Sequence, residues 1–594
     1  MPQTSEAQAG TATPTQPQTQ GLPTGYEFSA GSGYALPEYP FVEPPELRTG
    51  EVKRHRIVIV GGGITGLTLA CSLARLGVKA LLLDEDNSVG VKGAASRGIC
   101  YTQKSLEIFH KLGIYERIRK KGTQWSVGRT FAGKDEVYSF DLRQQGNFNL
   151  SSQPPFINIQ QFYIEGYLVE RIQELGHVEL RWKSRVSAFA QNADFATLTV
   201  ETPAGSYQIE ADHVIDASGS RTPFHQWAGA TGQTHRGDDC WCIADVRFSR
   251  PPPMERHTWI EAPFNENRAV WQHLMADDVW RIDYQLAPNS DPDEVSSRTQ
   301  VRERLQRQFG MDVEVEIVWV GPYTYSSQCL DQLRVGRVFF MGDTAKVVSP
   351  FGARGGNTGV ADADNLAWKL AAVVRGRANQ KLLDSYNEER LEAAQENVRV
   401  TNRTTRFLRP VDHMERVFRN AAIGLARRHP FARSLVNTGR MAVANTYTRS
   451  SICEGAGGGH SVQNATFRWA HGVAGTNGIQ PGAEGTVNDL LLWAAGDLLV
   501  LVFGQLSAAA IQRLRQLAEY APVRSVQVLG PDERAQALEH VRDINARGIG
   551  HLQGACRVFG HAWALVRPDA YLAATGEAVD GQLVAAVKNT LGLH

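Results

Sequence analysis

The distribution of apolar residues near the start of the chain predicts a strand, a helix and a second strand. Ile57 to Val60 is a continuous apolar run, which is typical of a strand buried on both faces of a parallel sheet. From Leu67 to Leu76 the apolar residues recur with helical spacing, and Lys79 to Leu83 contains a second apolar run. In this order, the three segments predict a β–α–β unit that opens an α/β domain.

Three glycines occupy the junction between the first strand and the helix. Gly61 permits a tight turn, Gly63 lets the backbone approach a phosphate, and Gly66 lets the helix pack against the strand. The N–H groups at the start of the helix then point at a pyrophosphate. Asp84, directly after the second strand, is placed to accept hydrogen bonds from a ribose. This pattern predicts a bound dinucleotide, NAD or FAD; the alternative is a glycine-rich turn in an ordinary α/β domain.

Two later apolar segments, Val214 to Ser218 and Gly336 to Gly342, are expected to return as strands to the same sheet. Between them, several segments alternate apolar and polar residues with the period of two that strands show. A sheet inserted between two cofactor-binding halves would form a roof over the cofactor. The predicted strands of this sheet are Trp241 to Phe248, Arg256 to Ala262, Ala269 to Met275 and Val279 to Leu286.

The last third of the chain divides at Gly455 to Gly459. Before this boundary, residues 384–448 are rich in Arg and Ala with helical spacing, and their charges are interpreted as a solvated helix face. After it, strand and helix patterns alternate as a small α/β unit without a CxxC motif, which excludes thiol–disulfide chemistry there. The predicted elements are Leu498 to Phe503, Ala508 to Tyr520, Arg524 to Leu529 and Trp563 to Arg567.

Composition narrows the function classes. The 62 basic and 62 acidic residues give zero net charge, so neither nucleic acid nor an anionic membrane is an expected partner. Seven scattered cysteines are too few for a disulfide framework and favour a cytoplasmic protein. Cys240 and Cys242 lack a second pair of metal ligands, so no metal site is expected.

Two further segments are candidates for special roles. The apolar window Asp489 to Gly504 is interrupted and is too short to span a bilayer. The composition of Met1 to Thr24 predicts a flexible tail.

A second motif, in the middle of the chain, is far more specific than the first. Gly342 and Asp343 end a predicted strand, and Pro350 precedes a glycine-rich turn that runs from Phe351 to Gly359 into a predicted helix. Together with the first motif, it resembles the group A FAD-dependent aromatic hydroxylases, which include p-hydroxybenzoate, phenol and 3-(3-hydroxyphenyl)propionate hydroxylases. The resemblance covers about residues 55–400. It implies that the dinucleotide is FAD.

The resemblance also implies roles for residues of the first motif. Gly61, Gly63 and Gly66 would hold the FAD pyrophosphate, and Asp84 would bind the adenosine ribose. Arg97 falls where the family places an arginine near the pyrophosphate and the flavin, and its planar fork of donors suits a phosphate. The simpler alternatives are that Asp84 only ends a strand and that Arg97 is a surface cation.

Further roles are implied beside the flavin itself. Gln161 matches a flavin-side glutamine, although it could instead cap the helix that follows. Asp343, next to Gly342, would accept hydrogen bonds from the ribityl chain. Gly356 and Asn357, at the start of the next helix, would present N–H groups to the pyrimidine edge of the flavin and stabilise negative charge on the reduced ring.

One segment departs from the family pattern. The family usually has Asp-Gly followed by Ser and Arg after the returning strand, whereas this chain has Ser218 in place of the acid and His225 in place of the second arginine. Because that motif is associated with both FAD and reduced-nicotinamide use, the choice between NADH and NADPH stays open.

The resemblance implies an aromatic hydroxylase of the kind used in aromatic compound catabolism. NADPH or NADH would reduce the FAD, and O₂ would then form a flavin C4a-hydroperoxide that hydroxylates a phenolic or other electron-rich ring. The protein would exclude water, position the ring and remove a phenolic proton. The candidate catalytic residues are Pro350 of the second motif and, from the roof sheet, Gln272, Arg281 and Asp283.

The roof residues depend on strand register. The period of two places Arg281 and Asp283 on one face of their strand. They could instead form an exposed pair, and His273 and Tyr284 replace the candidates if the register differs by one residue.

The predicted fold class is α/β, with a Rossmann-like FAD-binding domain of the glutathione-reductase type, an inserted substrate sheet, a helical segment and a C-terminal thioredoxin-like domain. The C-terminal unit is expected to be structural or to form a homodimer. Alternatives are a flavin epoxidase or reductase of the same fold, or a non-catalytic flavin-binding scaffold. The predicted boundaries are 1–24 (tail), 25–52 (arm), 53–240 and 333–383 (FAD-binding domain), 241–332 (substrate sheet), 384–454 (helical segment) and 455–594 (C-terminal domain).

Overall fold

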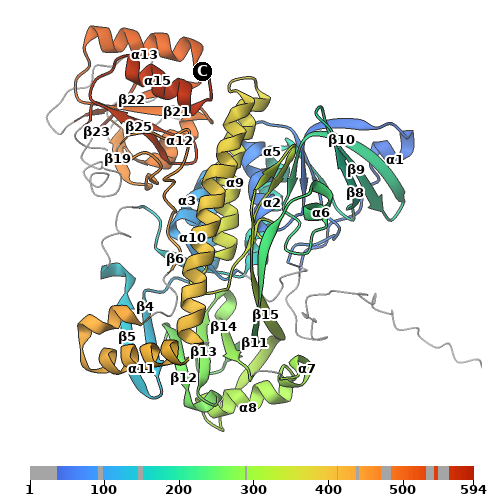
Figure 1. Ribbon diagram of the computed structural model, residues 1–594, viewed down its shortest axis with the longest axis vertical. Helices are drawn as coiled ribbons and strands as arrows, with labels where there is room; N and C mark the ends of the chain where they lie inside the picture. The colour runs from blue at the N-terminus through green and yellow to red at the C-terminus, as the bar shows by residue number, and fades with distance from the viewer. Residues whose placement is uncertain are drawn as a thin grey trace, which may run out of the picture.

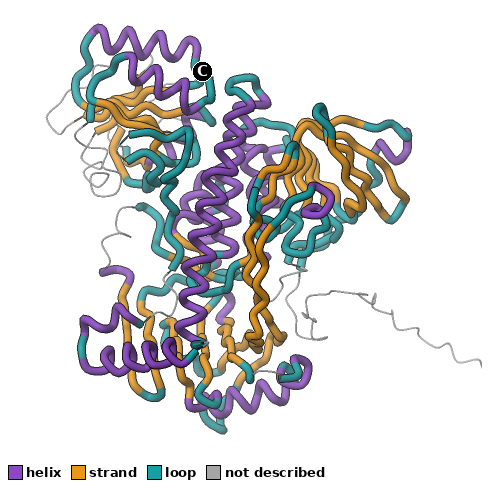
Figure 2. Tube along the Cα trace, in the orientation of Figure 1, coloured by secondary structure: helices purple, strands orange, loops and turns teal. Residues whose placement is uncertain are grey.

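In a computed structural model, the chain forms three sheet-containing bodies arranged around two long central helices (Figure 1). Figure 2 shows that the strands gather in these three bodies, while helices run between them. The structure describes residues 36–90, 98–144, 151–287, 290–410, 412–436, 441–455, 457–469, 483–529, 541–545 and 561–593. The predicted tail, residues 1–24, lies outside the described residues.

The first sheet contains the predicted β–α–β unit. Its central strand β1 pairs in parallel with β2 on one side and β10 on the other, in the order β16-β17-β10-β1-β2-β7, with β9 and β8 alongside β10. The apolar half of β1 is fully enclosed, as the continuous apolar run predicted. The strands are β1 (Lys53–Val60), β2 (Ala80–Leu83), β7 (Val178–Arg181), β8 (Arg185–Gln191), β9 (Ala196–Thr202), β10 (Gly205–Asp216), β16 (Arg334–Val335) and β17 (Val338–Phe340).

Helices cover this sheet and bring its glycine-rich segments together. Helix α2 packs against α5 and against α9, which begins almost three hundred residues later. Tyr39 of the N-terminal arm stacks on Trp182, with ring centroids 4.5 Å apart, so the described part of the arm lies on this domain. The helices are α1 (Pro45–Thr49), α2 (Ile64–Arg75), α3 (Gln103–Leu112), α4 (Tyr115–Lys121), α5 (Gln161–Leu175), α6 (Phe224–Ala228) and α9 (Gly355–Val374).

The second sheet contains all four strands predicted for the roof. It also includes β4 and β5, which come from the range assigned to the FAD-binding domain and join through parallel pairing of β4 with β12. Helices α7 (Pro292–Val295) and α8 (Arg298–Phe309) accompany it. Its strands, in spatial order, are β18 (Lys346–Val347), β15 (Val315–Leu330), β11 (Gly232–Phe248), β14 (Val279–Gln285), β13 (Arg268–Leu274), β12 (Arg256–Ala262), β4 (Val127–Ala132) and β5 (Asp135–Asp141).

Helix α10 (Asp384–Leu408) runs beside α9 from the level of the C-terminal domain down to the second sheet (Figure 1). Helix α11 (His413–Arg428) then packs against β5. Strands β3 (Cys100–Thr102) and β6 (Phe156–Asn158) form a separate two-stranded antiparallel sheet. Its strand β3 contacts α9. The segment predicted to be helical, residues 384–454, is thus helical over α10 and α11, has a short 3-10 helix at Pro430–Leu435, and contains no helix over residues 441–454.

The C-terminal domain is a seven-stranded sheet with a thioredoxin-like arrangement. Parallel β21 and β22 are joined through α13, and the antiparallel β24–β25 pair is followed by α15. Two predicted elements, β21 and α13, have the predicted bounds. The elements are β19 (Thr466–Trp469), β20 (Glu484–Thr486), α12 (Val487–Ala494), β21 (Leu498–Phe503), α13 (Ala508–Tyr520), β22 (Val523–Leu529), β23 (Val541–Asn545), β24 (Trp563–Val566), β25 (Leu572–Gly576) and α15 (Gly581–Thr590).

Within the described ranges, no helix combines the length and the apolar character needed to cross a membrane.

Candidate active site

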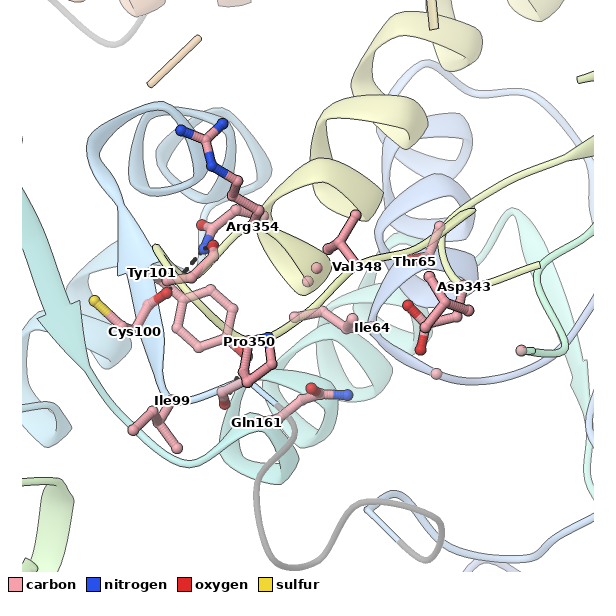
Figure 3. A pocket seen from close by; sticks show the side chains of 18 of the residues that line it. Ile64, Thr65, Ile99, Cys100, Tyr101, Gln161, Asp343, Val348, Pro350 and Arg354 are labelled. Atoms are coloured by element: carbon pink, nitrogen blue, oxygen red, sulfur yellow. Dashed lines mark hydrogen bonds between the residues drawn. The ribbon is translucent and has the colours of Figure 1, made fainter. Parts of the chain in front are cut away.

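A cavity of about 360 Å³ extends from the glycine-rich edge of the first sheet to the inner face of the second. This volume is in the range of small-molecule sites. The cavity lies at the carboxyl ends of β1 and β2, where open α/β sheets bind their ligands. In Figure 3, Thr65 and Asp343 lie at one side of it and Ile99 and Cys100 at the other, with Pro350 between them.

The turn after β1 requires glycine. Gly61 has a φ of +108°, and a Cβ added there would lie 2.5 Å from the carbonyl oxygen of Ala217. A Cβ on Gly66 would lie 2.0 Å from the carbonyl oxygen of Gly61. At Gly63, by contrast, the nearest atom to an added Cβ would be a carboxylate oxygen of Glu165, 4.0 Å away. The backbone is therefore closely packed behind the turn and open on the cavity side.

Asp84 directly follows β2 and lines the cavity, which is the position predicted for an acid that binds a ribose. Its carboxylate accepts hydrogen bonds from the backbone N–H of Gly62 (2.5 Å) and of Asp86 (2.8 Å). These bonds fix the carboxylate beside the glycine turn. An acid held in this position can accept a further hydrogen bond from a ribose hydroxyl.

Glu165 is a cavity-lining carboxyl group that sequence reasoning did not select. It is 3% exposed and accepts a hydrogen bond from the amide of Gln161 (2.7 Å), one helical turn earlier in α5. Burial raises the pKa of Glu165 to about 7. Gln161 also lines the cavity, as Figure 3 shows, so the predicted glutamine lies at the site.

The second motif forms the opposite side of the cradle. Asp343, Gly356 and Asn357 all line the cavity, the last two in the first turn of α9. The Asn357 amide donates to the carbonyl of Cys100 (2.8 Å) and accepts from the N–H of Thr102 (2.9 Å). This side chain therefore ties α9 to β3, so the contribution of Asn357 to a ligand must come from its backbone.

Ser218, where the chain departs from the family pattern, lines the cavity and is bonded to Asp216, two residues earlier. The buried Asp216 carboxylate accepts hydrogen bonds from the hydroxyls of Ser218 (2.5 Å) and Thr222 (3.0 Å). Burial raises the pKa of Asp216 to about 6. His225 is bonded through its Nε2 to the carbonyl of Thr344, at 2.8 Å.

The inner face of the second sheet presents charged and aromatic groups to the cavity. Arg281 and Asp283 both line it, as predicted from their spacing. The Arg281 Nε lies 3.2 Å from a carboxylate oxygen of Asp245 and 3.8 Å from one of Asp283. Burial raises the pKa of Asp283 to about 6, against the opposing effect of Arg281. Arg256 also lines this wall and was missed as a site residue.

The prediction that Gln272 faces the pocket disagrees with the strand register. In the β13–β14 pairing, His273 lies opposite Arg281 and Trp271 lies opposite Asp283, so these four residues share the cavity face. Gln272 lies on the other face, where it accepts a hydrogen bond from Gln308 of α8 (3.2 Å). The alternative register, in which His273 faces the pocket in place of Gln272, is therefore correct for β13.

On β14, the alternative register, in which Tyr284 faces the pocket, is wrong. Tyr284 points away from the cavity and donates a hydrogen bond to the Gln308 side chain (2.7 Å). Pro350 lines the cavity next to Phe351. Arg97 lies outside the described residues.

The residues present fit FAD. A glycine turn that would reject a side chain faces the N-terminus of α2, which suits a pyrophosphate. Acids at two strand ends, Asp84 and Asp343, line the same cavity and suit the hydroxyls of a ribose and a ribityl chain. The N-terminus of α9 suits a group that gains negative charge.

Comparisons with known proteins agree with this fit. The chain matches the FAD binding domain family over residues 54–401. It is 30% identical over 350 residues to a flavin-dependent monooxygenase of Mycobacteroides abscessus, covering 57% of this chain and 71% of that protein. It is 26% identical over 426 residues to a 3-(3-hydroxy-phenyl)propionate/3-hydroxycinnamic acid hydroxylase of Mycolicibacterium gilvum, covering 72% and 71%.

Solved structures share the fold over most of the chain. The flavin-dependent monooxygenase PieE, in complex with FAD and substrate, matches with a TM-score of 0.74 at 20% identity, over 91% of this chain and 99% of that chain. Aklavinone-11 hydroxylase, in a ternary complex with FAD and aklavinone, matches with a TM-score of 0.69 at 19% identity, over 90% and 99%. The chain therefore belongs to the FAD binding domain family and is a flavin-dependent monooxygenase of the aromatic hydroxylase group that its motifs indicated.

Proposed function

We propose that this protein is an NAD(P)H-consuming, FAD-dependent monooxygenase that hydroxylates a phenolic or other electron-rich aromatic compound. The observation that carries the proposal is the continuity of the cavity, from the glycine turn and Asp343 to the face of the second sheet that presents Trp271 and Asp283. A cofactor seated along the glycines would face a substrate held against that sheet. When bound, FAD would supply electron transfer from a reduced nicotinamide and the activation of O₂.

The chain itself would enclose the ring and exclude water. Trp241, Trp271 and Phe351 line the cavity as one aromatic group, with ring centroids 4.6 Å apart for the two tryptophans and 5.1 Å apart for Trp271 and Phe351. Such rings suit an aromatic substrate through stacked or edge contacts. Pro350 completes this wall on the side of the second motif.

Asp283 is the residue that we assign to removing the phenolic proton. Its Oδ1 has no hydrogen-bond partner within the described part of the chain, and its pKa of about 6 leaves it ionised near neutral pH. A base whose pKa lies close to the working pH is effective in proton transfer. Arg281, held by Asp245, keeps this carboxylate in place.

The test is turnover by FAD-loaded protein with a panel of phenols and hydroxybenzoates. We expect substrate-stimulated NAD(P)H oxidation, matching O₂ uptake, and a product heavier by one oxygen in mass spectrometry. Hydrogen peroxide formation without a hydroxylated product would not count as turnover. A flavin-containing protein that none of these compounds stimulates would favour a non-catalytic scaffold, and an epoxide or a saturated ring among the products would favour the alternative reactions.

A further inference from the structure

Arg281 of β14 faces two carboxylates on the inner wall of the second sheet. Its Nε donates a hydrogen bond to Asp245 at 3.2 Å and lies 3.8 Å from a carboxylate oxygen of Asp283. The nearer carboxylate comes from β11, where Asp245 lies directly opposite Arg281 in the antiparallel register. Asp283 lies two residues farther along β14, on the same face as Arg281. The guanidinium is therefore shared unequally, and Asp245 has the closer contact.

Burial separates the two carboxylates by their access to a ligand. The side chains of Arg281 and Asp245 are 4% and 0% exposed, whereas that of Asp283 is 22% exposed. Arg281 and Asp283 line the cavity, and Asp245 lies behind them. A substrate in the cavity can thus meet Asp283 but not Asp245, so Asp245 can affect the reaction only through its neighbours.

The distance between Arg281 and Asp283 leaves an oxygen of Asp283 available for a proton. At 3.8 Å, the Nε of Arg281 is beyond hydrogen-bonding distance of the Asp283 Oδ1, and this oxygen has no hydrogen-bond partner in the described part of the chain. A carboxylate that accepts a direct hydrogen bond from a guanidinium is a weaker base. Burial raises the pKa of Asp283 to about 6, Arg281 acts to lower it, and Asp245 opposes that lowering.

Other charged groups face Asp283 from neighbouring elements. Arg256 of β12 also lowers the pKa of Asp283, with a smaller effect than Arg281. Burial and the two arginines hold the pKa of His273, opposite Arg281 on β13, well below its usual value, so His273 is neutral. Arg281 is therefore the cation whose position matters most to Asp283. The charged residues on the other walls of the cavity are Asp84, Asp86, Glu165, Asp343 and Arg354.

We propose that Asp245 is a positioning residue for the hydroxylation: it holds the Arg281 guanidinium away from Asp283 and leaves the Asp283 carboxylate able to accept the phenolic proton. Without the charge of Asp245, a small rotation of Arg281 would close the 3.8 Å gap and form a charge-assisted hydrogen bond with Asp283. The assignment rests on the proposed function, because it takes Asp283 as the base.

The test is Asp245→Asn, which removes the charge and retains the size of the side chain. Arg281 should then pair with Asp283 and lower its pKa, so the acid limb of kcat/KM for phenol hydroxylation should move from about pH 6 to a pH at least about one lower. More of Asp283 is then ionised at pH 5, so the rate at pH 5 should rise relative to the rate at pH 7. A structural defect alone would lower the rate at every pH and leave the acid limb in place.

The protonation of Asp283 can also be followed without turnover. In FAD-loaded protein without substrate, it is measured against pH by the infrared carboxyl band that Asp283→Asn removes. We expect a midpoint near pH 6 in the unmodified protein, a midpoint at least about one lower in Asp245→Asn, and a midpoint close to 6 in Asp245→Glu, which keeps the charge.

The double variant Asp245→Asn/Arg281→Met shows whether Arg281 carries the effect. It removes both members of the ion pair and leaves neither charge stranded, so it is also the comparison to use if the single variant does not fold. With no guanidinium to close on Asp283, its infrared midpoint should be at or above pH 6. A midpoint well below 6 would mean that Asp245 acts on Asp283 without Arg281, which overturns the proposal.

Glu316→Gln is the matched control, because Glu316 pairs with Arg247 on the same strand as Asp245 but at an exposed position. It should leave the acid limb and the midpoint unchanged. If both stay near pH 6 in Asp245→Asn, the proposal is overturned and the proposed function is unaffected. If the infrared midpoint moves as expected but the unmodified protein shows no acid limb in turnover, the role of Asp245 is supported and Asp283 is not the base.

Discussion

Arg567 of the C-terminal domain and Glu389 of helix α10 form a two-pronged ion pair in which neither side chain is exposed to solvent. The two N–O distances are 2.5 and 2.9 Å. Lys369 of α9 binds the same carboxylate at 2.8 Å and is equally buried. One carboxylate thus connects the C-terminal domain to both central helices, including α9, whose first turn lines the cavity.

Removing Arg567 should destabilise the whole protein rather than the C-terminal domain alone. Arg567→Leu leaves Glu389 buried with a single cation, and breaking a buried pair costs about 3–5 kcal/mol in the free energy of unfolding. Denaturant unfolding followed by flavin and tryptophan signals measures this loss. The control is Arg119→Ala, which removes an exposed pair with Glu116 and should have no measurable effect. Two separate transitions in the unmodified protein would contradict the coupling.

Gly66→Ala should abolish FAD retention. The new methyl group would lie 2.0 Å from the carbonyl oxygen of Gly61, so the turn would have to move. Gly424→Ala is a matched helical control, since a Cβ there meets no heavy atom within 4 Å, and it should leave FAD retention unchanged. The flavin content of the purified variants measures the difference. A yellow Gly66→Ala protein with normal flavin stoichiometry would contradict this account of the cradle.

Asp283→Asn should remove the acid limb of the pH profile for phenol hydroxylation. With a pKa of about 6, Asp283 is protonated below pH 6 and can no longer accept the phenolic proton, so the rate should fall there. The variant should be slower by roughly 10²- to 10⁴-fold, the usual contribution of a general base. The profile of kcat/KM between pH 5 and 8 is the measurement.

Gln272→Leu is the control for Asp283, because Gln272 lies on the opposite face of the sheet. Its acid limb should match that of the unmodified protein. If Gln272→Leu altered the pH profile and Asp283→Asn did not, the assignment of the two faces would be wrong.

Glu165 should make stability and FAD affinity depend on pH. Its pKa is raised from 4.5 to about 7, so the folded protein binds this proton more tightly than the unfolded chain. The favourable contribution is complete below pH 4.5 and is lost as the pH rises to 7. Glu165→Gln should therefore be more stable than the unmodified protein at pH 8, by an amount on the order of 3 kcal/mol, and not at pH 4.5.

FAD titration provides the second measurement for Glu165. A pyrophosphate at the N-terminus of α2 would repel the ionised carboxylate, so FAD should bind the unmodified protein more weakly at pH 8 than at pH 6. The Glu165→Gln variant should lack this difference. The same pH dependence in both proteins would show that another group is responsible.

Local patterns were sufficient for the elements that carry a clear apolar periodicity in one segment. The strands Arg256–Ala262 and Leu498–Phe503 have the predicted bounds, since alternating or continuous apolar residues carry the strand signal within one short segment. The glycine turn was equally readable from the spacing of its glycines between an apolar strand and a helix, and the close contacts at Gly61 and Gly66 agree with it. Asp84 and Asp343 followed from their places at the ends of strands.

Relations between strands were not readable in this way. Gln272 was assigned to the wrong face, because a one-residue offset between β13 and β14 reverses every side chain and nothing in either strand specifies the offset. Arg256 looked like any charged residue at the start of a strand until the fold enclosed it against Met441. Glu165 acquired its raised pKa only through burial beside another helix.

The sequence by itself therefore determined the opening β–α–β unit, the dinucleotide turn and the family, because each of these is carried by motifs of residues close together in the chain. Only the tertiary structure decided which faces meet in the cavity, which carboxylate serves which buried arginine, and how the C-terminal domain is attached to α9 and α10. Those properties depend on burial and on charges brought together across hundreds of residues, and neither is encoded in any single segment.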